Sequence, residues 1–89
     1  MDIKEKELAR NELIGMKVKI KKCNDPNWEG KKGLVIDETK NTFLIKIEKE
    51  EKRIAKKSAI FEFEYEDEKI SLNGSDIIYK PEDRIKKIR

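Results

Sequence analysis

The chain has 89 residues, enough for one domain with a small core, and 46% of them are charged against about 25% in an average globular domain. One cysteine and no histidine exclude an internal disulfide and a cysteine–histidine zinc site. No apolar run is long enough to span a membrane and no signal-peptide core is present, so we expect a cytoplasmic protein.

The first predicted element is a helix in the N-terminal segment, residues 1–14. Gly15 lies where glycine often follows the end of a helix. Leu8, Leu13 and Ile14 can share one apolar stripe. Because so short a helix is marginal alone, the stripe needs the rest of the chain or another protein to pack on. We predict a protein-partner contact at these three residues.

A half-buried strand is predicted from Met16 to Cys23, because apolar and basic side chains alternate there. One face carries the lysine row, defined as Lys17, Lys19 and Lys21, and Lys22 follows it. Lysines in such a row can bind phosphate groups, or they can protect an edge strand from pairing with another chain.

A β-hairpin is predicted within residues 28–47, where two β-branched apolar runs flank a polar turn. Asp37 and Asn41 suit that turn, since the first can cap it and the second tolerates the left-handed conformation. Gly30 and Gly33 permit a bulge or a close backbone approach where the first strand begins.

The second half of the chain continues with short strands and charged turns. A turn at 48–52 precedes a strand at 53–57, and a strand at 60–65 returns through a turn as a strand at 69–72. Phe61, Phe63 and Tyr65 share one face of the 60–65 strand and are predicted to be core, with Glu62 and Glu64 opposite. A further turn leads to a closing strand at 77–79.

The C-terminal segment, residues 80–89, is predicted to be a basic helix or tail. Pro81 suits the first turn of a helix, and Glu82 and Asp83 suit its positive end. With about six short strands and a helix at each end, the chain is predicted to be all-β. Residues 15–79 would form a closed or nearly closed antiparallel barrel.

Charge is unevenly distributed along the chain. Residues 15–57 carry thirteen Lys or Arg and seven Asp or Glu. Residues 58–76 carry one Lys and six Asp or Glu. We therefore predict a basic face, which attracts phosphate backbones, and a separate acidic face. A solvated mixed surface is the alternative, since abundant Lys, Glu and Ile without glutamine is typical of thermophiles. The predicted RNA contacts are Lys17, Lys19, Lys21, Lys22, Arg53, Lys56, Lys57, Arg84, Lys86, Lys87 and Arg89.

Residues for catalysis are lacking in the sequence. There is no histidine to act as a base, no nucleophile–base pair and no glycine-rich phosphate loop. We expect a binding module that holds no metal or cofactor.

Several segments resemble the archaeal ribonuclease P protein component 1 family, whose eukaryotic relatives belong to ribonuclease P and ribonuclease MRP. The resemblance begins at Glu12–Val18 and is most specific at Asp37–Thr42. It continues through Lys56–Lys57, Phe61 with Phe63, Asn73–Ser75 and Pro81–Arg84. Lys replaces Arg at many basic positions, and residues 48–52 are more charged than in the family.

The resemblance implies a strongly bent, Sm-like antiparallel barrel. It further implies a subunit of the ribonucleoprotein that removes the 5′ leader from precursor tRNA, in which the RNA subunit carries the active site and its Mg²⁺. This chain would bind and stabilise that RNA and pair with the zinc-ribbon subunit, alongside other protein subunits.

Two other functions remain open at this stage. Residues 30–35 resemble the glycine-centred core of a KOW-type ribosomal or transcription-factor barrel, although that match is short. The second alternative is a protein-interaction barrel or an Sm-type ring former, without a direct RNA role. The RNA that co-purifies with the chain separates the three.

Overall fold

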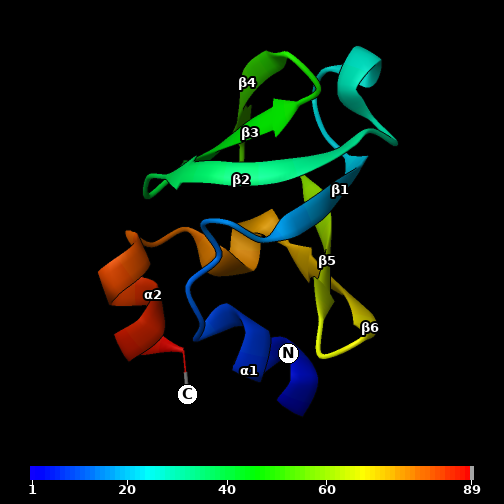
Figure 1. Ribbon diagram of the computed structural model, residues 1–89. Helices are drawn as coiled ribbons and strands as arrows, with labels where there is room; N and C mark the ends of the chain where they lie inside the picture. Colours follow the sequence, from blue (N-terminus) through cyan, green and yellow to red (C-terminus); the bar gives the residue numbers. More distant parts are fainter. Residues whose placement is uncertain (89) are drawn as a thin grey trace.

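The computed structural model describes residues 1–88 and contains a six-stranded antiparallel sheet with a short α-helix near each end (Figure 1). In chain order the elements are α1 (Ile3–Ala9), β1 (Lys17–Lys22), the 3-10 helix η1 (Pro26–Trp28), β2 (Lys32–Glu38), β3 (Thr42–Ile47), β4 (Glu50–Ala55), β5 (Ile60–Tyr65), β6 (Glu68–Asn73), the 3-10 helix η2 (Gly74–Ile77) and α2 (Pro81–Lys87). The sequence predicted an all-β chain with terminal helices, and the structure confirms a mostly-β architecture with a short helix near each end.

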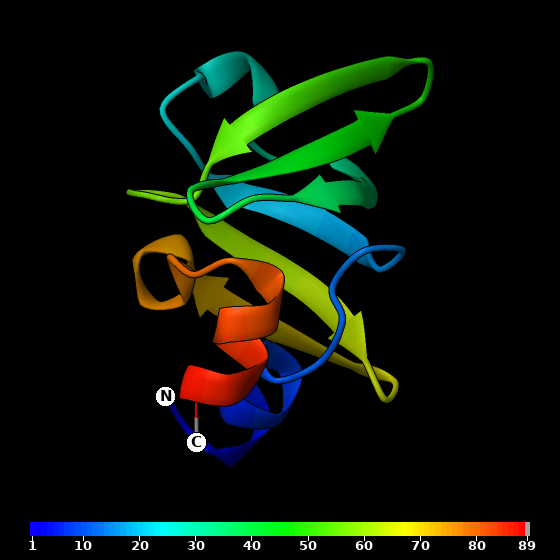
Figure 2. The ribbon, with the colours of Figure 1, turned by 90° about the vertical axis from the view of Figure 1, so that its left-hand side faces the viewer.

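The strands are ordered β4-β3-β2-β1-β5-β6, so that β1 lies in the middle of the sheet. The pairing shifts register in β1 between Ile20 and Lys22 and in β2 between Val35 and Asp37. Such irregularities bend a strand and increase its twist. In Figure 2 the β2–β4 part lies above and the β5–β6 hairpin crosses below it. Because β4 and β6 are the two ends of this order, closure of a barrel stays a prediction.

The core lies on the concave side of the bent sheet, where alternate residues of the strands meet. Phe43, Phe61 and Phe63 are fully buried, as the alternating pattern of the 60–65 strand predicted for the last two. The rings of Phe43 and Phe61 meet edge to face with centroids 5.0 Å apart. The predicted 48–52 turn is shorter than expected, because β4 pairs with β3 from Ala55 back to Glu50.

Helix α1 packs on the chain itself, against β6. Leu8 and Leu13, two of the three predicted partner contacts, are fully buried in the chain's own core, and Ala9 lies beside them. This corrects the prediction for those two leucines. Only Ile14, which is 40% exposed, remains at the surface.

The predicted closing strand at 77–79 is wrong. Residues 74–77 form η2 instead, and Ile77 is buried beneath the sheet. Gly74 makes this possible, because a Cβ at that position would collide with the backbone carbonyl of Lys56. The predicted C-terminal helix is confirmed as α2, which starts at Pro81.

Candidate nucleic-acid interface

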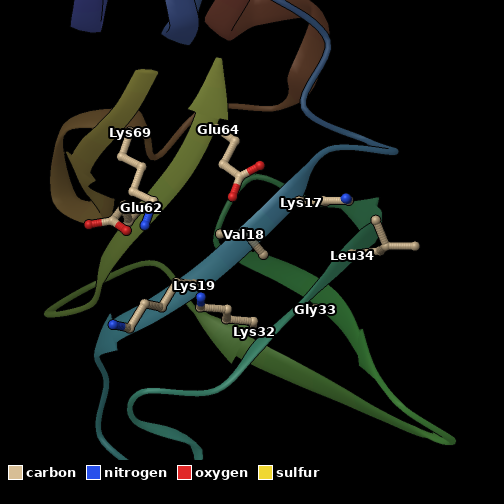
Figure 3. Close-up of a pocket in the computed structure, with 9 residues that line it drawn as sticks. All are labelled: Lys17, Val18, Lys19, Lys32, Gly33, Leu34, Glu62, Glu64 and Lys69. Carbon is tan, nitrogen blue, oxygen red and sulfur yellow. The ribbon is translucent and has the colours of Figure 1, made fainter. Parts of the chain in front are cut away.

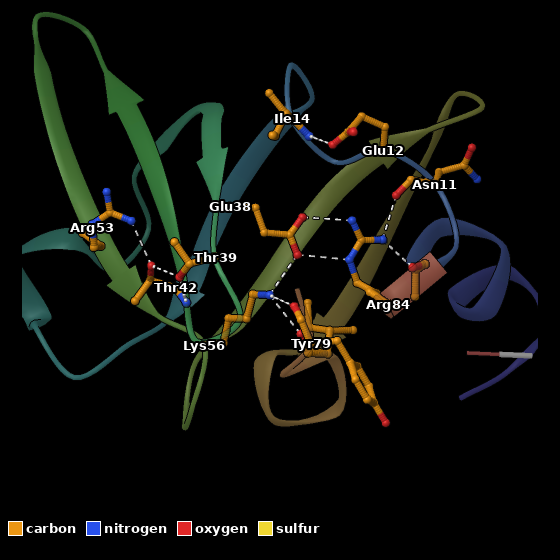
Figure 4. A network of polar contacts seen from close by, with 12 residues as sticks. Asn11, Glu12, Ile14, Glu38, Thr39, Thr42, Arg53, Lys56, Tyr79 and Arg84 are labelled. Carbon is orange, nitrogen blue, oxygen red and sulfur yellow. Dashed lines mark hydrogen bonds and ion pairs between the residues drawn. The ribbon is translucent and has the colours of Figure 1, made fainter. Parts of the chain in front are cut away.

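Three fully buried charged side chains, Glu38, Lys56 and Arg84, form what we call the buried charge network (Figure 4). The Lys56 ammonium donates to Glu38 Oε2 at 2.8 Å. The Arg84 guanidinium grips the same carboxylate with two bonds, from Nε to Oε2 at 3.0 Å and from an Nη to Oε1 at 2.9 Å. One carboxylate therefore faces two cations, which leaves the network with an excess positive charge.

Backbone carbonyls accept the remaining donors of the two cations. Lys56 Nζ also donates to the carbonyls of Ile77 at 3.0 Å and Tyr79 at 3.1 Å, which uses all three ammonium hydrogens. Arg84 donates to the carbonyls of Ala9, the last residue of α1, and of Asn11, two residues further on. Within residues 1–88, no buried polar side-chain atom lacks a partner. The network thus joins the end of β2 to α1, to the segment after η2 and to α2.

Burial lowers the pKa of the Lys56 ammonium below its ordinary value of 10.5. The hydrogen bond and charge of Glu38 oppose this lowering, while the Arg84 charge adds to it. The ammonium also lies 4.8 Å from the centroid of the Phe43 ring, a favourable cation–π position.

The side chains of Lys56 and Arg84 do not reach the surface. The prediction that these two residues contact phosphate groups is therefore corrected.

The lysine row lies on a central strand, not on an edge. β1 pairs with β2 on one side and with β5 on the other. Val18 and Ile20 point into the core, and Lys17, Lys19 and Lys21 project from the opposite, outer face. The edge-protection alternative is therefore wrong, because β1 has no free edge along this row.

Acidic side chains stand directly beside the lysine row, which corrects the prediction of a separate acidic face. β5 pairs with β1 so that Glu62 lies opposite Lys19. The Lys21 ammonium lies 3.6 Å from a Glu62 carboxylate oxygen. Glu64 lines the same surface hollow as Lys17 and Lys19 (Figure 3). The positive potential of the row is partly cancelled on its β5 side.

The other predicted basic residues lie at separate places. Arg53 is on β4, which is separated from β1 by β2 and β3, and it donates to Thr42 Oγ1 at 3.0 Å. Lys57 is exposed in the turn before β5, and Lys22 is exposed at the end of β1. Lys86 and Lys87 are exposed on α2. Arg89 lies outside the described residues.

No three His, Cys, Asp or Glu side chains of residues 1–88 gather where they could hold a metal ion. None of the helices within that range is long and apolar enough to cross a membrane.

Sequence reasoning missed Glu38 and the basic side chain of Lys32. Glu38 follows the register shift in β2, which turns its side chain inward, so simple alternation gave no signal. Lys32 could have been found from a hairpin register that places it opposite Lys19.

Comparison with known proteins finds a matching family and similar proteins. The family described as "Ribonuclease P/MRP, subunit p29" matches residues 6–87. The "Ribonuclease P protein component 1" of Thermococcus sibiricus is 46% identical over 82 residues, which cover 92% of this chain and 66% of that protein. The protein of the same description from Methanosphaera stadtmanae is 42% identical over 79 residues, which cover 88% of this chain and 85% of that one.

A solved structure is also similar. It is described as "Mth11: A homologue of human RNase P protein Rpp29", and it is 34% identical with a TM-score of 0.60. The match covers 84% of this chain and 99% of that one. The chain therefore spans almost the whole of this structure, but just under two thirds of the Thermococcus relative.

Proposed function

The chain belongs to the ribonuclease P/MRP subunit p29 family, and on that premise we propose that it binds RNA as a protein subunit of ribonuclease P. That ribonucleoprotein removes the 5′ leader from precursor tRNA. The RNA subunit carries the active site and its Mg²⁺, and this chain binds and stabilises that RNA. The family match over residues 6–87 is the observation that carries the proposal.

The outer face of β1 supports RNA binding on physical grounds. Lys17 is exposed and Lys19 is half-buried on a strand held rigidly between two neighbours. Positive side chains on a rigid frame can match the regular spacing of phosphates, and such binding follows the shape of the RNA and weakens with salt. Further phosphate contacts are proposed at Lys21, Lys22, Arg53, Lys57, Lys86 and Lys87.

The protein partners follow from the family. We assign to this chain the zinc-ribbon subunit of ribonuclease P as a heterodimer partner, together with the other protein subunits. Ile14 is the one predicted contact residue whose side chain is still available, at 40% exposure. On the same proposal, the bent sheet corresponds to the Sm-like barrel of the family. The complex would work in the cytoplasm.

Co-purification tests the proposal against its alternatives. The tagged chain is expressed in an archaeal host and recovered at low salt, and the bound RNA is sequenced. Enrichment of ribonuclease P RNA is expected. Enrichment of ribosomal RNA would favour the KOW-type barrel, and recovery of proteins without RNA would favour a protein-interaction barrel.

A further inference from the structure

Lys19 on β1 stands directly opposite Lys32 on β2. The Ile20 N–H donates to the Lys31 carbonyl at 2.9 Å, and the Val35 N–H donates to the Met16 carbonyl at 3.1 Å. In an antiparallel ladder, hydrogen-bonded and non-hydrogen-bonded residue pairs alternate. The pair of Lys19 and Lys32 is therefore of the non-hydrogen-bonded kind, in which facing side chains come closest.

Two like charges in such a pair repel each other and destabilise the sheet. Neither Lys19 nor Lys32 forms an ion pair with any residue in the range 1–88, although Lys21 on the same strand is paired with Glu62. Within the described chain the repulsion of the Lys19–Lys32 pair is therefore reduced only by the nearby charges of Glu62 and Glu64, and no ion pair removes it. An anion placed between the two ammonium groups would remove it.

The pair lines a surface cavity of about 290 Å³ on the outer face of β1, β2 and β5 (Figure 3). Leu34 forms an apolar wall next to the pair and is 41% exposed. One water molecule takes about 30 Å³ in the liquid, so the cavity holds more than a single ion. It offers two cations for an anion and an apolar surface for a group attached to that anion.

We propose that the Lys19–Lys32 pair binds one phosphodiester of the RNA, with the adjoining nucleoside packed on Leu34. This inference rests on the proposed function and names a subsite within it. The phosphate oxygens accept hydrogen bonds from both ammonium groups, while the nucleoside removes exposed apolar surface from water.

The two glutamates beside the pair decide on which side the RNA lies. Glu62 and Glu64 project from β5 and line the cavity on the side away from β2. Their carboxylates repel phosphate, and they separate Lys69 on β6 from the pair. The RNA backbone therefore passes over β1 and β2 and turns away before β5.

The test compares two double variants of the full chain. Lys19→Gln/Lys32→Gln removes the pair, and Lys40→Gln/Lys49→Gln removes two exposed lysines in the hairpin turns as a matched change of charge. A labelled, in vitro transcribed archaeal ribonuclease P RNA is titrated by fluorescence anisotropy over a series of KCl concentrations. Melting of each free variant is followed by circular dichroism.

The first double variant is expected to bind at least tenfold more weakly than the control, since hydrogen bonds to charged groups are each worth about a factor of ten or more. Its slope of log affinity against log salt should become shallower by about 0.7 to 0.9, the value for one phosphate that is no longer neutralised. Its melting temperature should rise by up to about 8 °C, because the repulsion is gone.

Three results count against these statements in different ways. Equal affinities and salt slopes for the two double variants would overturn the subsite. The proposed function would stand in that case, provided that the wild-type chain binds the RNA. A drop in melting temperature for Lys19→Gln/Lys32→Gln would show that the pair is structural, and would also overturn it. Failure of the wild-type chain to bind the RNA at any salt concentration would instead refute the proposed function, and the subsite with it.

Discussion

Replacing Glu38 by Gln should destabilise the protein by about 3–5 kcal/mol, because it leaves two buried cations without their counter-charge. The amide oxygen of Glu38→Gln can take the place of Oε2, which receives bonds from Lys56 and Arg84. The amide nitrogen then faces the Arg84 Nη that donated to Oε1, so that two donors meet. The loss comes from the missing charge and from this unmade hydrogen bond together.

Such a loss is a large part of the roughly 5–15 kcal/mol by which native proteins are stable. For a domain of this size it corresponds to a fall in melting temperature of about 12–40 °C. Urea unfolding followed by circular dichroism measures the free energy directly. Glu51→Gln is the matched control, since Glu51 is exposed on β4 and should change stability by less than about 0.5 kcal/mol.

A loss below about 1 kcal/mol for Glu38→Gln would refute the view that the three charged side chains of the network are shielded from water and depend on one another. A triple variant, Glu38→Leu/Lys56→Met/Arg84→Met, separates the two possible causes of a large loss. Because apolar replacement of a whole buried ion network is often neutral or stabilising, the triple variant should recover most of the stability. No recovery would mean that the contacts to the backbone carbonyls, and not the charges, hold the segments together.

Three further outcomes are expected. Gly74→Ala should lower the free energy of unfolding by at least about 1–3 kcal/mol, because its Cβ collides with the Lys56 carbonyl, and unchanged urea unfolding would contradict this. Deletion of residues 1–13 should lower the melting temperature by more than about 10 °C, since two buried leucines are lost from the core. An unchanged melting curve would instead support the original prediction that the apolar stripe contacts a protein partner. Lys17→Glu should weaken RNA binding more than Lys21→Glu, because Lys21 is already paired with a carboxylate; equal losses in anisotropy titrations would count against the assigned surface.

Local patterns predicted most of the strands, because each depends on nearby residues. Alternation located β1, and the Phe61 and Phe63 positions on β5 identified the core face. The same reasoning failed for the apolar segment after Gly74. It has the composition of a strand, but the close approach of Gly74 to Lys56 and the burial of Ile77 decide its path.

Charged residues were the main source of error at the candidate site. Lys and Arg are almost never fully buried unless they are paired, so a sequence without its fold places Lys56 and Arg84 at the surface. Their partner, Glu38, is eighteen residues from Lys56 and forty-six from Arg84 along the chain. Only the folded chain, which brings together the end of β2, the turn after β4 and α2, shows that the three side chains share one site.

The residues that carried the family resemblance turn out to serve mainly the architecture. Glu38 lies in the most specific segment, Gly74 in Asn73–Ser75 and Arg84 at the end of Pro81–Arg84, and all three belong to or support the buried charge network. At these three positions the residues that carry the resemblance therefore lie in the folded interior. Because Glu38 and Arg84 do not face solvent, the proposed contacts with RNA include exposed lysines on the outer face of β1 and β2, such as Lys17 inside Glu12–Val18 and Lys32 on β2.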